Sequence, residues 1–415
     1  MEILDKWATE IFLSANTIEQ LNFLRVYPMF GIDQKRLVDL WIDTYHRCMI
    51  DEILIENLKS FIIIGLSHNY LEPDESRCLI LMEIFRNLGT SYKLLESRQA
   101  KLKSMISDFR LPKFITPVST IKQSRSLSLS LGSKLRYSRI LAYNLKLFDG
   151  CRILDNDIKI LAAIINLKYT YLFNKLTPHE IINRSLDCNY PSPTLVQIFN
   201  LFDKLSSIVP NEILVKCKSK SDRINSINKF ITLAENFLDM RNYEAFFAII
   251  SGLCHSSISR IKSLWHPGKK HTKKFLQLET IIQHDGGYQN YRNIIPRKEK
   301  CIPYMGLILA DINHCAQMGI IDVDKKQINL ACYHSIVEII NKYIKQIPII
   351  DPIIYAKTDK TILEEIDNYI ILDENELYEL SVKIFPLAKM AKISYKPRPK
   401  STIGLLSAKR RMTMV

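Results

Sequence analysis

The sequence predicts an all-α fold, with a smaller helical amino-terminal domain followed by a larger helical domain. The 415 residues include only 12 glycines, fewer than turn-rich β structure needs. Apolar residues recur at helical spacing along most of the chain, and no alternation typical of strands persists. From residue 153 onward, prolines such as Pro178, Pro193 and Pro210 stand where helices are expected to begin or end.

Residues 1–110 are expected to form the amino-terminal helical domain. Residues 1–20 carry apolar side chains that recur at helical spacing, namely Ile3, Leu4, Trp7, Ile11 and Phe12. The same periodicity continues over 54–66 and 78–88, and Glu72-Pro73 interrupts it between them. Farther along, the two prolines at 348 and 352 predict a loop that extends to residue 359.

The excess of basic residues is confined to two segments. The net charge is +14, yet no acidic residue lies between Asp108 and Asp149 or after Glu379. We therefore divide the chain into the domain at 1–110, a basic Ser-rich linker at 111–150, the larger helical domain at 151–395 and a basic tail at 396–415. Such basic segments suit an anionic membrane surface, and a solubilising linker and tail remain an equal alternative.

Several function classes lack their signatures. The nine cysteines include no C-x-x-C pair, which predicts reduced thiols in a cytoplasmic protein and neither a metal site nor a disulfide framework. No secretory signal or membrane-spanning run is visible, and no P-loop or other cofactor motif occurs, so no cofactor is expected. His179-Glu180 lacks a second histidine four residues from the first and is interpreted as a helix-surface feature. The Lys, Ile and Asn bias is typical of an AT-rich genome, which leaves a microbial protein acting in a host-cell cytoplasm as an alternative.

Four segments follow one another in a fixed order. They read NYEAFFAIISGL at 242–253, ISRIKSLW at 258–265, GYQNYR at 287–292 and CIPYMG at 301–306. In this order they resemble the catalytic domain of Ras-type guanine-nucleotide exchange factors such as Son of sevenless. The resemblance covers roughly residues 153–387.

Shorter stretches extend the resemblance. Matches also occur at Asp222-Arg223, at Ile328-Asn329-Leu330 and in the segment ELYELS at 376–381. FLRVYPMF at 23–30 and KRLVDLW at 35–41 are similar to the amino-terminal exchanger motif of the same family. By resemblance, that module is helical and braces a catalytic hairpin.

The resemblance implies a function without bond chemistry: binding a Ras-family small GTPase and promoting GDP release. A helical hairpin from Pro303 to Gly319 would project and open the switch region of the GTPase. The catalytic candidates on it are Leu309, Asp311, Asn313, His314 and Gln317. The GTPase-binding candidates are Phe199, Asn200, Phe247, Cys254, Tyr288 and Tyr304. From the pattern alone, the hairpin helix and the aromatic residues could equally belong to the core.

The sequence departs from the family pattern at several of these positions. Gln317 replaces a glutamate usual in the hairpin, Cys254 replaces an asparagine after S-G-L, and Asn200 stands where a relative has arginine. Met318-Gly319 differs from the usual E-G-N ending. An exchange-deficient GTPase-binding module is therefore a second interpretation. A basic helical nucleic-acid binder is a third, disfavoured because the charge lies in the linker and tail.

Overall fold

The computed structural model describes residues 2–48, 51–88, 96, 152–266, 269–295, 299–322, 327–358 and 360–386. The expected linker and tail, including the Ser-rich stretch, lie outside these ranges. The all-α prediction is confirmed. In the described ranges the only strands are β1 (Ile321–Asp322) and β2 (Gln327–Ile328), an antiparallel pair that the sequence analysis did not predict.

The chain forms two compact units, each assembled from separate stretches. Of the described residues, those within Met1–Leu127, Thr177–Tyr190 and Leu309–Lys342 form unit 1, and the others form unit 2. Helix α16 (Met305–Gln317) begins in unit 2 and enters unit 1, and α17 (Leu330–Gln346) makes the reverse passage.

The amino-terminal part of unit 1 is a helical array with an aromatic core. It comprises α1 (Glu2–Leu13), α2 (Thr17–Val26), the 3₁₀ turn η1 (Tyr27–Phe30), α3 (Gln34–Arg47), α4 (Glu52–Ser67) and α5 (Glu75–Asn87). The helices expected over 54–66 and 78–88 are present, whereas the opening segment divides in two because Asn16 caps a second helix. Phe12, Phe23 and Phe61 are fully buried and in mutual ring contact. These rings form the centre of the array.

Unit 1 also contains α9 (Pro178–Leu186) and the hairpin made by α16, the two strands and α17. Helix α9 begins with a capping box in which Thr177 and Glu180 exchange hydrogen bonds. Gly319 follows α16 with φ +84°, the left-handed conformation expected of a glycine that ends a helix.

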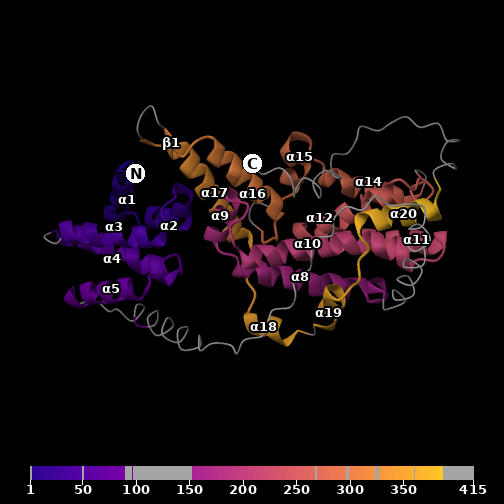
Figure 1. Cartoon of the computed structure of the whole chain (residues 1–415), viewed down its shortest axis with the longest axis horizontal. Coiled ribbons are helices and arrows are strands. Elements are labelled where there is room, and N and C mark those ends of the chain that lie inside the picture. The colour runs from indigo at the N-terminus through magenta and orange to yellow at the C-terminus, as the bar shows by residue number, and fades with distance from the viewer. Residues whose placement is uncertain are drawn as a thin grey trace, which may run out of the picture. The chain divides into compact units, whose positions relative to one another are not determined.

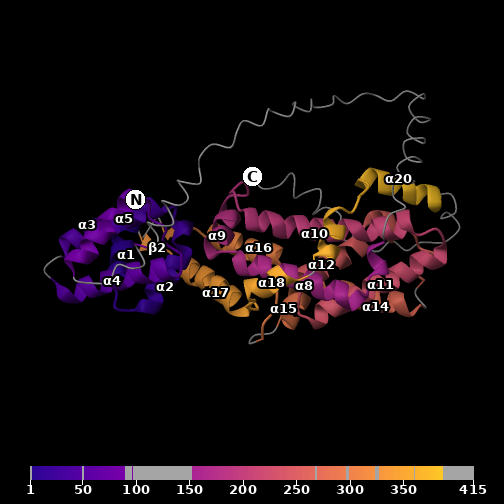
Figure 2. The same ribbon diagram turned by 90° about the horizontal axis from the view of Figure 1, so that it is seen from below.

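Unit 2 is built around α12 (Tyr243–Leu253), whose residues are buried on nearly every side. It packs against α8 (Ile158–Lys175), α10 (Pro193–Asn211) and α11 (Lys220–Asp239), which run beside it in Figure 1 and Figure 2. A Cβ atom at Gly252 would lie 2.5 Å from the Ser206 carbonyl oxygen and 2.7 Å from Val209 Cβ. The close approach of α10 and α12 therefore requires glycine at this position.

The other elements of unit 2 surround these helices. They are η2 (Ile153–Asp155), η3 (Glu212–Lys216), α13 (Ser256–Ser259), α14 (Lys270–Ile281), α15 (Asp285–Ile294), α18 (Pro352–Lys357), α19 (Thr361–Asp367) and α20 (Glu374–Ile384). Two expectations were wrong. Pro210 lies inside α10, which continues into the π-helical turn η3, and the loop expected after Pro348 contains the short helix α18, capped by Asp351.

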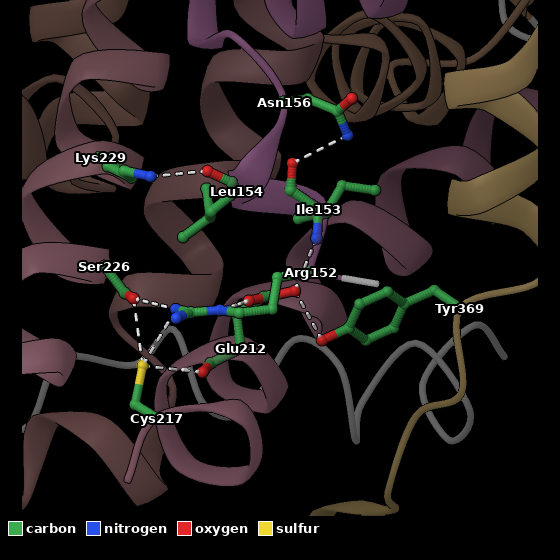
Figure 3. Close-up of polar contacts among 9 residues, drawn as sticks. All are labelled: Arg152, Ile153, Leu154, Asn156, Glu212, Cys217, Ser226, Lys229 and Tyr369. Atoms are coloured by element: carbon green, nitrogen blue, oxygen red, sulfur yellow. Dashed lines mark hydrogen bonds and ion pairs between the residues drawn. The ribbon is translucent and has the colours of Figure 1, made fainter. Parts of the chain in front are cut away.

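A buried polar network fixes the start of unit 2 (Figure 3). The Glu212 carboxylate, fully shielded from solvent, accepts hydrogen bonds from the Ile153 backbone N–H (2.9 Å) and the Tyr369 hydroxyl (3.1 Å). Arg152 forms an ion pair with Glu212 and donates to Ser226 Oγ (2.8 Å). Because a buried carboxylate requires such partners, the network ties segment 152–156 to η3 and α11.

Candidate functional site

The root of α16 is fixed to the start of α12 within unit 2. The Ile302 N–H donates to the Arg241 carbonyl (2.9 Å), and the Tyr243 N–H donates to the Ile302 carbonyl (2.8 Å). The Met305 N–H then donates to Glu244 Oε2 (2.7 Å), and the Glu244 side chain is buried. A carboxylate at a helix N-terminus satisfies a free N–H group and opposes the positive end of the helix dipole. The orientation of α16 at its start is therefore set by α12.

Asn242, the first residue of the N-Y pair, caps α12 at its start. Its side chain is fully buried, and Oδ1 accepts a hydrogen bond from the Ala245 N–H (3.0 Å), which caps the helix. Its Nδ2 donates to Asn166 Oδ1 on α8 (3.0 Å). Asn242 therefore positions α12 and, through the neighbouring backbone bridge to Ile302, the root of α16.

Three of the aromatic candidates come together in unit 2. The rings of Phe247 and Tyr304 stack with centroids 4.2 Å apart, and Tyr288 lies 6.1 Å from Phe247 and 6.2 Å from Tyr304. We call Phe202, Phe247, Tyr288, Tyr291 and Tyr304 the aromatic cluster. Phe247 and Tyr304 are buried, whereas Tyr288 is only half-buried. Tyr288 is thus the member most open to a partner.

Sequence reasoning missed two members of this cluster. Tyr291 contacts Phe247 with centroids 5.1 Å apart, and its hydroxyl accepts a hydrogen bond from the Tyr304 N–H (2.8 Å). Phe202 contacts Tyr304 with centroids 6.1 Å apart. The signals were present, since Tyr291 belongs to the N-Y-x-x-Y-R match and Phe202 lies one helical turn beyond Phe199.

An uncommon backbone conformation presents Tyr288. Gly286, Gly287 and Tyr288 have φ of 59°, 66° and 64°, so these three residues form a left-handed turn. Positive φ is unfavourable for a side chain as large as tyrosine, and surrounding contacts must hold it. The His284 ring lies 4.4 Å from that of Tyr288, and burial lowers the pKa of His284.

The remaining binding candidates lie on α10 and at the end of α12. Phe199 is half-buried and Asn200 is exposed on α10. Cys254 follows α12, and its Sγ lies 3.6 Å from Glu279 Oε1 on α14. Burial raises the pKa of the Cys254 thiol well above its ordinary value, so this side chain is a neutral contact between helices.

The five catalytic candidates follow one another along the part of α16 in unit 1. Leu309 and Asp311 are half-buried, and His314 and Gln317 are exposed. Asn313 donates to the Ser185 carbonyl in the last turn of α9 (3.1 Å) and accepts a hydrogen bond from Gln317 (2.9 Å). The polar residues therefore have two kinds of position. Asn313 attaches the hairpin to α9, whereas His314 and Gln317 face solvent.

The amino-terminal helices hold the hairpin within unit 1. Asn341 on α17 accepts a hydrogen bond from Arg25 Nη1 (2.5 Å) and donates to Asn22 Oδ1 (2.9 Å). The Trp7 ring meets Tyr333 edge to face at 5.1 Å. Asn22, Arg25 and Trp7 lie in or before the stretch that resembles the exchanger motif, so these residues provide direct support to α17.

The structure corrects the interpretation of His179 as a helix-surface feature. Its ring lies between Tyr27 (4.9 Å) and Tyr70 (5.5 Å), and Nε2 is 2.7 Å from the Leu24 carbonyl oxygen. Burial lowers its pKa. The side chain joins α9 to the amino-terminal helices. A local motif could not have revealed this, because all its partners lie more than 100 residues away in the chain.

Arg260 and Trp265, both within the segment ISRIKSLW, bond to the scaffold of unit 2. Arg260 donates to the carbonyl oxygens of Ser381 (2.9 Å) and Phe385 (3.0 Å), which joins α13 to α20. Trp265 Nε1 donates to the Ile258 carbonyl (3.2 Å). The match at 376–381 is thereby placed beside the match at 258–265.

The described part of the chain shows no group of three or more His, Cys, Asp or Glu side chains arranged to hold a metal ion. In the same ranges, no helix combines the length and apolar character that crossing a bilayer requires.

Comparison with known proteins places these features in a family. The family model described as the RasGEF domain matches residues 160–334. Ras guanine nucleotide exchange factor J of Dictyostelium discoideum is 24% identical over 85% of this chain and 39% of its own length. Ras-specific guanine nucleotide-releasing factor 2 of Mus musculus is 26% identical over 54% of this chain and 19% of its own. Ras guanine nucleotide exchange factor D of Dictyostelium discoideum is 32% identical over 37% and 23%.

Each of these alignments spans less than half of the relative. The family match includes α8 through the start of α17 and therefore covers the root of α16, the aromatic cluster and most of the hairpin. The chain therefore contains a Ras-type guanine-nucleotide exchange factor (RasGEF) catalytic domain.

Proposed function

We propose that this chain is a guanine-nucleotide exchange factor that binds a Ras-family small GTPase and promotes release of its GDP. The observation that carries the proposal is the root of α16, where residues of three family motifs meet. The Met305 N–H donates to the Glu244 carboxylate there, and the preceding Tyr304 N–H donates to the Tyr291 hydroxyl. A helix fixed in this way can transmit force to a partner without bending.

The hairpin would act by differential binding. Exchange is accelerated only if the hairpin contacts the nucleotide-free state of the GTPase more strongly than the loaded state. Asp311, His314 and Gln317 are the residues proposed to meet the switch region. Asn313 is proposed to act through Gln317, because the two side chains are hydrogen-bonded to each other.

The aromatic cluster would take an aromatic side chain from the GTPase. Tyr288 is half-buried and stands beside the stacked pair of Phe247 and Tyr304, so it offers a ring surface next to a rigid support. A single aromatic anchor of this kind contributes about 2 kcal/mol or more to binding. Phe199 and Asn200, on the half-buried and exposed sides of α10, are proposed to extend this surface.

Gln317 supports a second candidate function, a module that binds the GTPase without releasing nucleotide. An amide accepts and donates hydrogen bonds, but it cannot replace the charge of a phosphate. If exchange depends on that charge, a hairpin with Gln317 binds and does not release. The neutral thiol of Cys254 removes a polar side chain from the same family pattern.

Nucleotide release separates the two candidates. The full chain is mixed with Ras-, Rap- and Ral-type GTPases loaded with fluorescent GDP, and both release and binding are measured. Accelerated release by one GTPase type is expected. Binding without release would favour the second candidate, and the absence of both would reject the exchange proposal.

Two substitutions test the assigned roles. Tyr288→Ala is expected to weaken GTPase binding about 30-fold, equivalent to about 2 kcal/mol, because the exposed anchor is lost. Tyr378→Ala, at an exposed tyrosine on α20, is the matched control and should bind like the parent. An equal Kd for the two variants would remove Tyr288 from the interface.

Gln317→Glu is expected to accelerate release about tenfold, a lowering of the barrier by about 1.4 kcal/mol, because it adds an anion to the hairpin. Gln277→Glu, at an exposed position of α14 outside the hairpin, adds the same charge elsewhere and should leave the rate unchanged. Equal rates for the parent and Gln317→Glu would show that position 317 does not meet the GTPase.

A further inference from the structure

An exposed aliphatic surface stands out in unit 2, on the segment between α17 and α19. Ile349, Ile353 and Ile354 expose 87%, 61% and 59% of their surface. Helix α18, which carries the last two, buries only Tyr355. Adjacent exposed isoleucines are costly in water and mark a surface that is covered in use.

The segment that carries these isoleucines is firmly held. Asn174 at the end of α8 donates to the Pro348 carbonyl (2.6 Å) and accepts from the Ile350 N–H (3.4 Å). Asp351 caps α18 by accepting from the Ile353 N–H (2.8 Å). The ring of Tyr355 stacks on Tyr171 of α8, with centroids 3.9 Å apart and planes 11° from parallel. The isoleucines are therefore presented by a fixed scaffold that lies along α8 (Figure 1).

Lysine ammonium groups surround the tyrosine pair. Lys168 and Lys360 lie 5.9 Å and 5.7 Å from the centroid of Tyr355, and Lys175 lies 4.6 Å from that of Tyr171. Lys168 and Lys175 stand one turn before and one turn after Tyr171, on the same face of α8. Among the described residues, no carboxylate forms an ion pair with any of these three lysines. We call Ile349, Ile353, Ile354, the two tyrosines and the three lysines the Ile–Lys surface.

We propose that the Ile–Lys surface binds a bilayer rich in anionic phospholipid. Isoleucine side chains enter the boundary of the acyl chains, tyrosines prefer the interface between apolar and aqueous layers, and lysines reach the phosphate groups above it. The Ile–Lys surface therefore supplies apolar, interfacial and basic side chains from neighbouring residues. The segment between α17 and α19 contains two acids, Asp351 and Asp359, against the three lysines of the surface. The Asp351 carboxylate is occupied by the cap of α18, and Asp359 lies outside the described residues.

Charge composition favours a bilayer over a protein partner. The cores of protein interfaces are depleted in lysine, whereas an anionic leaflet attracts basic residues beside an apolar patch. A second copy of this chain would bring like-charged lysines together. The bilayer is therefore the occupant that satisfies both the apolar and the charged part of the surface. This inference does not depend on nucleotide exchange, and it concerns residues other than the basic linker and tail.

Vesicle binding tests the proposal with the full chain. Sedimentation is measured with vesicles of phosphatidylcholine alone and with about 30% phosphatidylserine. We expect the double variant Ile353→Ser/Ile354→Ser to bind the anionic vesicles about tenfold more weakly than the parent. Lys175→Gln/Lys360→Gln should weaken this binding and leave binding to the neutral vesicles unchanged.

The control is Ile18→Ser/Ile53→Ser, which removes two isoleucines of similar exposure (69% and 75%) from unit 1. It should bind like the parent, and each variant is checked for an unchanged unfolding transition. Equal binding by the parent and the Ile353→Ser/Ile354→Ser variant would overturn the proposal. So would a change of oligomeric state in that variant without a change in vesicle binding, since the surface would then be a contact between copies.

Direct insertion gives a second readout that does not depend on loss of binding. Ile354→Trp adds a fluorophore at the surface to the native Trp7, Trp41 and Trp265. Anionic vesicles with brominated acyl chains should quench its emission beyond the quenching of the parent. Quenching equal to that of the parent would show that position 354 stays outside the bilayer.

Discussion

The two ends of the hairpin helix are supported in different ways. The root of α16 in unit 2 is held by neighbouring family motifs, through a backbone bridge to Ile302 and the buried carboxylate of Glu244. The hairpin in unit 1 is held through two of its own side chains. Asn341 accepts a hydrogen bond from Arg25 of the amino-terminal helices, and Asn313 donates to the Ser185 carbonyl of α9. The root combines backbone bonds with buried side-chain acceptors, and the hairpin depends on individual, partly buried side-chain bonds.

This difference predicts different sensitivities. Backbone bonds survive most substitutions, because every residue but proline supplies the same donor and acceptor. Side-chain bonds such as that between Arg25 and Asn341 are lost with one replacement. Unit 2 should therefore be destabilised mainly by substitutions that add atoms to its packed core. The hairpin support should be weakened by substitutions that remove a single polar side chain.

The largest effect is expected at Gly252. Gly252→Ala places a methyl group against the Ser206 carbonyl and Val209, and backbone atoms in packed helices cannot move aside easily. We expect the free energy of unfolding to fall by about 3 kcal/mol, the upper part of the range for overpacking. Denaturant titration measures the change. Ser251→Ala on the same helix is the control, and an equal loss in both variants would argue against the close approach of α10 and α12.

A smaller effect is expected at the hairpin support. Asn341→Ala removes the acceptor for Arg25 and the donor to Asn22, and we expect a loss of about 1 kcal/mol in the free energy of unfolding. Amide hydrogen exchange should rise in the 330–342 part of α17 and remain unchanged in α12. Faster exchange in both helices would contradict an independent support in unit 1.

The smallest effect is a pH dependence at His179. Burial lowers its pKa in the folded protein below the ordinary value of 6.5, so the unfolded chain binds the proton more readily. The stabilisation is complete above about pH 6.5 and is lost as the pH falls below that value. His179→Gln should flatten part of this dependence in unfolding measured between pH 5 and 8. The exposed His314, replaced in the same way, is the comparison, and identical curves for parent and His179→Gln would refute the role.

The sequence predicts the features that depend on neighbouring residues. Asn242, Gly319, Arg260 and Trp265 take the structural roles that capping rules or the motif pattern indicate. The grouping of Phe247, Tyr288 and Tyr304 follows from the family resemblance, since their positions along the chain span 58 residues and no local rule joins them.

The remaining features depend on contacts between distant segments. The inward position of His179 results from Leu24, Tyr27 and Tyr70, none of which a helical pattern around residue 179 could reveal. The strands β1 and β2 are two residues each, too short for any alternation to appear. Pro348 and Pro352 predicted a loop in place of the short helix α18. Pro352 in fact occupies the first turn of that helix, where proline is tolerated.

The composition of unit 1 has a practical consequence for dividing this protein. An expression fragment that starts after the basic linker would retain α9 and the hairpin. It would lack Trp7, which packs against Tyr333, and the Arg25 and Asn22 side chains that bond to Asn341. The exposed ring and orphaned amide would favour self-association of such a fragment. Weak exchange activity of such a fragment would then result from the missing amino-terminal helices and not from a poor catalytic site.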